Sequence, residues 1–182
     1  MDVLTYFNLK ERIIEAGYAD DVAWAENPRI CASADDFARE HAFVVCNSGM
    51  KAQIAVEIFR RVWAALIESR PIDDTIFRNK PKRRAMQYVY DNRERLFAEY
   101  NAAEDKIAYL ETLPYIGAII KFHLAKNFGF DCCKPDRHLV RVAGMYADGT
   151  PEALCQRLSE ETGNNINTVD VVIWRAANLR FI

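Results

Sequence analysis

The chain has 182 residues, enough for one compact domain or for two interlocked helical lobes around a buried core. Apolar residues make up 51% and charged residues 27%, which is typical of a globular protein in water. The formal net charge of −2 excludes a protein that binds nucleic acid through a general positive excess, so such binding would need a local basic face.

Neither the N-terminus nor any apolar stretch predicts secretion or a membrane span. Residues 1–4 lack the regions of a secretory signal, and Lys121 and His123 interrupt the most apolar region. The five cysteines form no CxxC spacing and cannot gather around an iron–sulfur cluster near the C-terminus, so they are interpreted as reduced thiols. We expect a protein of the cytoplasm (nucleoid-associated) or nucleus, with no metal site and no membrane partner.

Nearly every segment has the helical period, and no alternating run predicts a strand. The first helix is expected to stop at Gly17. The residues that mark its buried face are Leu4, Phe7 and Ile14. Ser33 is placed to cap a helix that Asn47-Ser48-Gly49 interrupts.

Four further helices are expected near residues 54–66, 81–96, 102–110 and 118–128. The first of these ends before Pro71, and Pro81 fits the first turn of the second. Gly129 ends the last of them.

The C-terminal part continues the helical pattern. Asp136 should open a helix, Thr150-Pro151 is a good cap and first turn for the next, and Gly163 closes that one. Thr168 is expected to cap the last helix. The three tryptophans, Trp24, Trp63 and Trp174, are assigned to the core. The predicted fold is therefore all-α, a two-lobed array of about ten short helices.

Residues 103–143 carry the most specific pattern, two helices joined by the hairpin Leu113-Pro114-Tyr115-Ile116-Gly117. Proline fixes one backbone angle, and glycine permits the close approach of another backbone. The amides from Ile116 to Ile119 lack intrahelical partners and lie at the positive end of a helix, so they can bind a phosphate without a basic side chain. Taken alone, the hairpin is more typical of an ordinary helix–helix turn, because such turns are common.

Together with the segment from Lys134 to Val142, the hairpin resembles the helix-hairpin-helix (HhH-GPD) DNA glycosylase superfamily. The family pattern runs Leu-Pro-Gly-(Val/Ile)-Gly, then a short apolar helix ending in Phe-Gly, then Asp-x-His-(hydrophobic)-x-Arg-(hydrophobic). The matching residues are Leu113, Pro114, Ile116, Gly117, Phe128, Gly129, Asp136, His138, Leu139, Arg141 and Val142. The resemblance spans roughly residues 35–178, and its most specific matches lie within residues 110–143. It implies a single HhH-GPD-like domain over residues 1–182.

The resemblance implies a monomeric DNA N-glycosylase that acts on double-stranded DNA in base excision repair, with Asp136 as the catalytic carboxylate. Cutting a base from deoxyribose leaves positive charge on the sugar, which an ionised, partly desolvated carboxylate stabilises while it activates water. The damaged, mismatched or modified base is first rotated out of the stack. Asp136 can also cap its helix, and one residue can do both.

Contacts to DNA are expected from the hairpin residues Pro114, Tyr115, Ile116, Gly117, Ala118 and Ile119, and from Asn47 and His138. Asn47 lies near the position where relatives fill the gap left by the flipped base, and an ordinary turn is the alternative. His138 is expected to contact the DNA backbone or to be structural. Some relatives bind a monovalent cation through hairpin carbonyls, and the resemblance implies no other cofactor.

Two residues depart from the family pattern. Tyr115 replaces the first hairpin glycine, so that the turn must adapt or Tyr115 adds a contact to DNA. Ile119 stands where bifunctional members carry a Schiff-base lysine, which implies a monofunctional enzyme without AP-lyase activity. Lys121 is not expected to substitute, because two steps along a helix turn it about 200° away.

Three other functions stay open: a non-catalytic helix-hairpin-helix DNA-binding protein, a glycosylase-like enzyme of hypermodified-base metabolism as in some phage-type relatives, and a plain helical adaptor. The basic run from Arg78 to Arg84 could face phosphates or could be an ordinary solvated face. The identity of the substrate base is not encoded in any pattern of the sequence.

Overall fold

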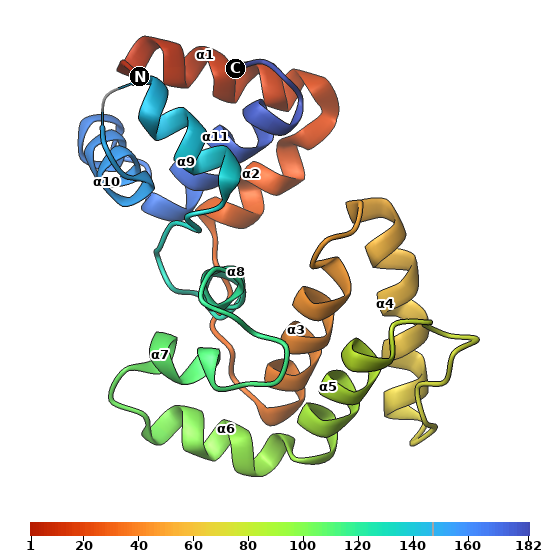
Figure 1. Cartoon of the computed structure of the whole chain (residues 1–182). Helices are drawn as coiled ribbons and strands as arrows, with labels where there is room; N and C mark the ends of the chain where they lie inside the picture. The colour runs from red at the N-terminus through yellow and green to blue at the C-terminus, as the bar shows by residue number, and fades with distance from the viewer. Residues whose placement is uncertain (147) are drawn as a thin grey trace. The chain divides into compact units, whose positions relative to one another are not determined.

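The computed structural model describes residues 1–146 and 148–182, and within them every regular element is a helix, which confirms the all-α prediction (Figure 1). The contacts divide the chain into two compact units. We call Met1–Arg29 with Gly129–Ile182 the terminal unit, and Ile30–Phe128 the central unit.

The terminal unit is built around its last helix. Its helices are α1 (Val3–Ile13), the π-helical turn η1 (Ile14–Tyr18), α2 (Ala19–Glu26), α9 (Arg137–Met145), α10 (Pro151–Thr162) and α11 (Ile166–Asn178). Helix α11 contacts α1, α2, α9 and α10, and most of its residues are buried. This arrangement buries apolar side chains from both ends of the chain in one core.

The buried face of α1 differs from the predicted one. Tyr6, Leu9 and Ile13 are buried, whereas the predicted Leu4 is 72% exposed and Phe7 and Ile14 are also exposed. The residues at 6, 9 and 13 follow the i, i+3, i+7 spacing of one continuous helical stripe, and Ile14 already belongs to η1. Helix α1 ends at Ile13, earlier than predicted, and Gly17, with φ of 90°, interrupts the helical backbone within η1.

Most predicted caps are confirmed. The side chains of Ser33 and Thr150 accept the amides of Asp36 and Ala153, and Gly163 ends α10 in the left-handed conformation. The cap of α11 was wrongly placed, because Asn165 accepts the amide of Thr168 at 2.6 Å. Thr168 is itself buried in the first turn.

The central unit is built around α3 (Ala34–Asn47). Its other helices are α4 (Ala52–Ile67), α5 (Lys80–Asp91), α6 (Arg93–Ala102), α7 (Lys106–Glu111) and α8 (Ile120–Asn127). Helix α3 contacts α4, α5, α6 and α8, and α7 contacts α8. The ring of Phe37 on α3 lies 5.3 Å from that of Phe128 and 5.6 Å from that of Tyr100, so an aromatic cluster fills one part of this core.

Two boundaries in this unit differ from the prediction. The segment expected as one helix over 81–96 is divided at Asn92, whose side-chain amide donates to the carbonyl of Tyr88 at 2.9 Å. Asparagine side chains compete with the helical backbone for such partners, which explains the break. Helix α7 starts at Lys106 after its cap Asp105, not at Ala102.

The tryptophans are less buried than predicted. Trp24 is 37% exposed, and Trp63 and Trp174 are only partly buried. Trp174 packs against the core of the terminal unit, and Trp63 contacts Phe59 and Tyr90. The assignment of Trp24 to the core was therefore wrong.

Candidate active site and nucleic-acid interface

The candidate residues fall in both units. Asp136 and His138 belong to the terminal unit, whereas Asn47 and the hairpin residues 114–119 belong to the central unit.

Asp136 is the N-cap of α9. Its Oδ1 accepts the backbone amides of His138 at 2.9 Å and Leu139 at 3.3 Å, which confirms the predicted cap. The side chain is 16% exposed, and Oδ2 lies 3.9 Å from Nζ of Lys134. The helix start therefore fixes the orientation of the carboxylate and leaves its second oxygen outside the capping bonds.

His138 holds Asp136 through its backbone amide. Its side chain is partly buried. This contact involves the backbone of His138, so the roles predicted for its side chain stay predictions.

Lys134 is a neighbour of Asp136 that the sequence interpretation did not single out. Its side chain is 26% exposed, and burial lowers the pKa of its amine while the Asp136 carboxylate opposes this. A signal was available, because Lys134 lies two residues before Asp136 in the same motif.

The hairpin buries Leu113 and Ile116 and exposes Gly117, Ala118 and Ile119. A turn is closed by the amide of Ile116, which donates to the carbonyl of Leu113 at 3.1 Å. Helix α8 has Ile119 as its N-cap, without a side-chain capping bond. The amides of Gly117, Ala118 and Ile119 make no hydrogen bond to the described part of the chain, so they are free for an anion.

Tyr115 has a backbone conformation that glycine adopts most easily. Its φ is 69°, in the left-handed region that non-glycine residues rarely adopt, and its side chain is 41% exposed.

His41 on α3 is a contact of the hairpin that sequence reasoning missed. Its ring is fully buried, and Nε2 lies 2.9 Å from the carbonyl oxygen of Pro114, to which it donates. Burial lowers the pKa of His41 from 6.5 to about 4, although the bond to Pro114 opposes this shift. Within the described residues Nδ1 has no partner, and no sequence signal links positions 41 and 114.

Asn47 is the last residue of α3 and is partly buried. The following turn is held by Lys82, a buried residue of the basic run, whose Nζ donates to the carbonyl of Ser48 at 2.5 Å. Nζ also lies 5.5 Å from the centroid of the Tyr115 ring. Lys82 thus brings the turn after Asn47 close to the hairpin, and it is not part of a solvated face.

Ile119 has no amine, in contrast to the lysine that bifunctional members of the family have at this position. Ile119 is 42% exposed, and the nearby Lys121 forms an ion pair with Glu111 at 2.6 Å. The absence of a role for Lys121 in catalysis stays a prediction.

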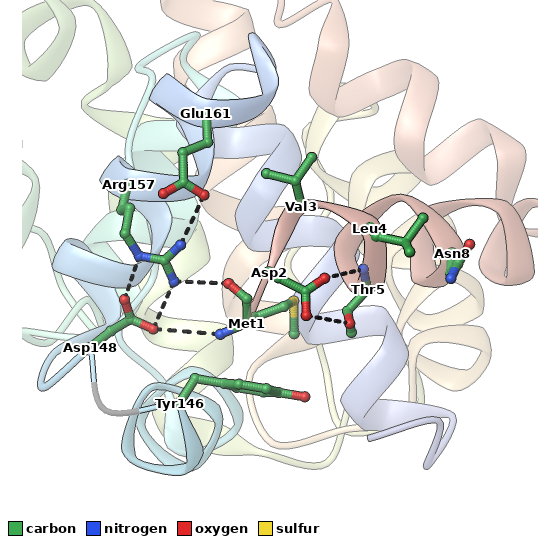
Figure 2. Close-up of a pocket in the computed structure, with 10 residues that line it drawn as sticks. All are labelled: Met1, Asp2, Val3, Leu4, Thr5, Asn8, Tyr146, Asp148, Arg157 and Glu161. Carbon is green, nitrogen blue, oxygen red and sulfur yellow. Dashed lines mark hydrogen bonds and ion pairs between the residues drawn. The ribbon is translucent and has the colours of Figure 1, made fainter.

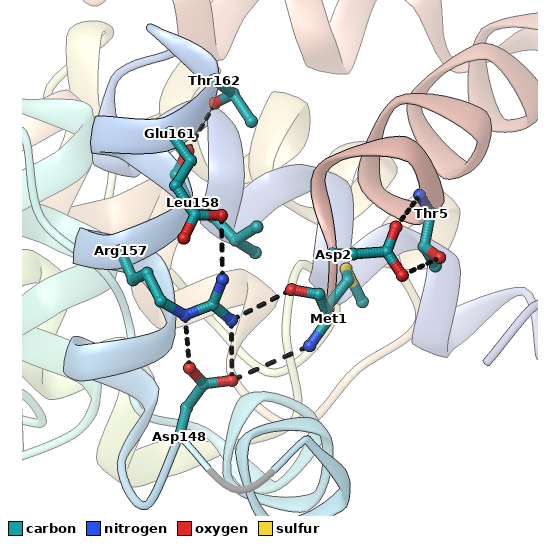
Figure 3. Close-up of polar contacts among 8 residues, drawn as sticks. All are labelled: Met1, Asp2, Thr5, Asp148, Arg157, Leu158, Glu161 and Thr162. Carbon is teal, nitrogen blue, oxygen red and sulfur yellow. Dashed lines mark hydrogen bonds and ion pairs between the residues drawn. The ribbon is translucent and has the colours of Figure 1, made fainter.

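The terminal unit also contains an open hollow of about 830 Å³ (Figure 2). In it Arg157 contacts both carboxylate oxygens of Asp148, at 2.7 and 3.0 Å, and donates to the carbonyl of Met1 at 3.0 Å (Figure 3). The Met1 amine lies 3.9 Å from Asp148. Because these charges are paired with one another, we interpret the network as an anchor for the start of α1.

The described residues include no group of three or more His, Cys, Asp or Glu side chains that could hold a metal ion. None of the five cysteines forms a disulfide within the part of the chain that the structure describes. The carbonyls of Leu113 and Pro114 accept bonds from Ile116 and His41, so neither depends on a cation for a partner. Among the residues that the structure describes, no helix is long and apolar enough to cross a membrane.

Comparison of the chain with models of protein families, with curated proteins and with solved structures finds no match. The functional assignment therefore depends on the residues and geometry described above.

Proposed function

We propose that the protein is a monofunctional DNA N-glycosylase that excises a damaged, mismatched or modified base, acting as a monomer on double-stranded DNA in the cytoplasm or nucleus. The observation that carries the proposal is the left-handed backbone of Tyr115. A tyrosine in this conformation is strained, yet it preserves the turn that the family pattern needs at its glycine. Ser69 and Arg180 also have a left-handed backbone, so the support comes from the position of Tyr115, which coincides with the first glycine of the family's hairpin pattern.

The hairpin holds a phosphate of the DNA backbone in this proposal. The amides of Gly117, Ala118 and Ile119 provide donors at the positive end of α8, which explains how a chain with a net charge of −2 binds DNA locally. His41 and Lys82 keep the hairpin in place against α3 and the turn after Asn47. Asn47 fills the gap that the rotated base leaves.

Asp136 performs the chemical step. As the N-glycosidic bond breaks, the base leaves with the electron pair and the sugar develops positive charge, which the carboxylate stabilises. A water molecule then adds to C1′ of the sugar and gives a proton to Asp136. The amides of His138 and Leu139 hold the carboxylate in one orientation, so it does not have to reorganise during the reaction.

Asp136→Asn tests the assignment, because asparagine keeps the cap and removes the charge. We expect this variant to lose at least about a hundredfold in the rate of base release while duplex affinity stays near the wild-type value. The measurement uses labelled duplexes that each carry one modified or mismatched base, followed by alkali to cleave abasic sites.

Asp136→Ala is the matched control for stability. It removes both charge and cap, so we expect it to unfold about 1 kcal/mol more easily than Asp136→Asn. Full base release by Asp136→Asn would contradict the catalytic role. Duplex binding with no cleavage of any substrate would instead favour a non-catalytic binding protein or an enzyme of hypermodified-base metabolism.

A further inference from the structure

The loop that leads to Asp136 is bonded to helix α11 in both directions. Oδ1 of Asp131, near the beginning of the loop, accepts the backbone amide of Asn167 on α11 at 2.8 Å. In return, Oδ1 of Asp170 on α11 accepts the backbone amide of Lys134 in the loop at 3.4 Å. Each of the two elements thus provides a carboxylate to the backbone of the other, over a sequence separation of 36 positions in both cases.

The start of a helix favours the contact with Asp131. Asn167 lies in the first turn of α11, where backbone amides have no partner within the helix and where the helix dipole attracts a negative group. The N-cap Asn165 accepts the amide of Thr168, so Asp131 satisfies a further amide of the same turn. The loop therefore supplies a second capping side chain, and it is fixed to a helix that is itself mostly buried.

The rest of the loop is held between these two bonds. Asp170 is 1% exposed, and Cys133 is buried in the core of the terminal unit. Pro135 restricts the backbone, and the carbonyl of Lys134 accepts the amide of Asp136 at 2.7 Å. The residues that precede Asp136 therefore have little freedom to move away from α11.

We propose that Asp131 and Asp170 are positioning residues, which hold the loop on α11 and so fix the place of the Asp136 carboxylate. This inference rests on the proposed function and deepens it. The amides of His138 and Leu139 fix the orientation of the carboxylate at its own helix, and α11 fixes where that helix begins. A displaced carboxylate stabilises the charge on the sugar less well, because the interaction weakens with distance.

Asp131 is the residue to substitute, because its side chain is exposed, whereas loss of the buried Asp170 carboxylate would disturb the core. Asp131→Ala removes the bond to Asn167, and Asp131→Asn keeps an oxygen that can accept the same amide. Thr150→Ala is the matched control. It also removes one side-chain bond to a first-turn amide in the terminal unit, but on α10 and outside the loop.

Single-turnover base release and duplex affinity separate positioning from binding. We expect Asp131→Ala to release the base roughly tenfold more slowly, while its duplex Kd stays within about twofold of the wild-type value. Asp131→Asn should restore the rate to within about threefold of the wild-type rate, because the amide oxygen replaces the carboxylate oxygen. Thr150→Ala should keep the wild-type rate, since a loss of stability alone does not slow the molecules that remain folded.

Hydrogen exchange of single amides, followed by NMR, tests the link to Asp136 without any substrate. We expect the amides of His138 and Leu139 to exchange at least about tenfold faster in Asp131→Ala, because a loosened loop lets the carboxylate leave the cap. In Asp131→Asn and Thr150→Ala the two amides should exchange as in the wild-type protein.

Unchanged exchange at these two amides, or base release by Asp131→Ala at the wild-type rate, would overturn the inference and leave the glycosylase proposal intact. Equal effects of Asp131→Ala and Thr150→Ala would also overturn it, because they would indicate a general loss of stability. A wild-type protein that releases no base from any duplex would contradict the proposed excision. The exchange measurement would then still decide whether α11 fixes the carboxylate of Asp136.

Discussion

At the scale of single residues, the backbone of Tyr115 is strained. A non-glycine residue whose backbone φ is 69° destabilises the fold by about 1–2 kcal/mol relative to the same residue in an ordinary backbone conformation. The ring lies near the Lys82 ammonium, 5.5 Å from Nζ, but is still 41% exposed, so packing within the protein accounts for only part of its contacts. In the proposed function the remaining part of the ring faces DNA.

The strain can be measured with two substitutions that both remove the ring. Asparagine tolerates the left-handed region, whereas valine, which is branched at Cβ, does not. We expect Tyr115→Val to be less stable than Tyr115→Asn by about 1 kcal/mol in urea unfolding. Equal stability of the two variants would mean that the backbone of residue 115 is not held in this conformation.

At the scale of the element, the hairpin and the start of α8 form a surface on which small residues leave the backbone accessible. A Cβ added at Gly117 would meet nothing within 4 Å, and this residue does not have a left-handed φ. The fold itself therefore places no requirement for glycine at 117. A ligand backbone that approaches the hairpin closely would explain the glycine.

Gly117→Ala tests this explanation. We expect its stability to stay unchanged or to rise by about 0.5 kcal/mol, because alanine reduces the entropy of the unfolded chain. Duplex binding should weaken roughly tenfold, a loss of about 1.4 kcal/mol, because the methyl group blocks the phosphate. Gly144→Ala on α9, where a Cβ is equally free, is the matched control.

Fluorescence anisotropy with a labelled duplex measures the change in affinity for both variants. The control should bind as tightly as the wild-type protein. Unchanged binding by Gly117→Ala would exclude a close approach of DNA at the hairpin.

At the scale of the whole molecule, the two units contain different acid-sensitive groups. Buried His41 in the central unit has a pKa of about 4, below its unfolded value of 6.5. In the terminal unit, hydrogen bonds from Arg157 hold the pKa of Asp148 below its ordinary value of 3.8. Both groups contribute stability at neutral pH, and this contribution is lost on acidification in a different pH range for each group.

The central unit should therefore lose stability at a milder acidity. Between pH 6.5 and about 4 the unfolded chain binds a proton at His41 that the folded unit does not, so stability falls as the pH falls through this range. The loss is on the order of 3 kcal/mol at most. Asp148 contributes in the terminal unit only at lower pH, as its carboxylate is protonated.

Hydrogen exchange read by mass spectrometry at pH 7, 5.5 and 4 follows each unit separately. We expect protection of α3 and the hairpin to fall before that of α11. His41→Gln, whose amide can still donate to Pro114, should reduce this pH dependence in the central unit. An unchanged pH dependence in the variant would show that another group is responsible.

The all-α class, most helix ends and the cap at Asp136 could be predicted from the sequence because they depend on local interactions. A serine, threonine or aspartate bonds to amides two or three residues away, and a glycine adopts a left-handed backbone without help from the rest of the fold. The same local rules failed at the start of α11, where Asn165 and Thr168 are both acceptable caps and the choice depends on which side chain is buried.

The sequence by itself thus determined the helical period, most of the caps and the hairpin motif, all of which are set within a few residues. Only the tertiary structure decided which face of α1 is buried, because both faces carry apolar side chains. It also decided the contact of His41 with Pro114, 73 positions apart, and the burial of Lys82 under the turn after Asn47. Such contacts depend on how helices pack, because a side chain's partners and its loss of water are set by elements that lie far away along the chain.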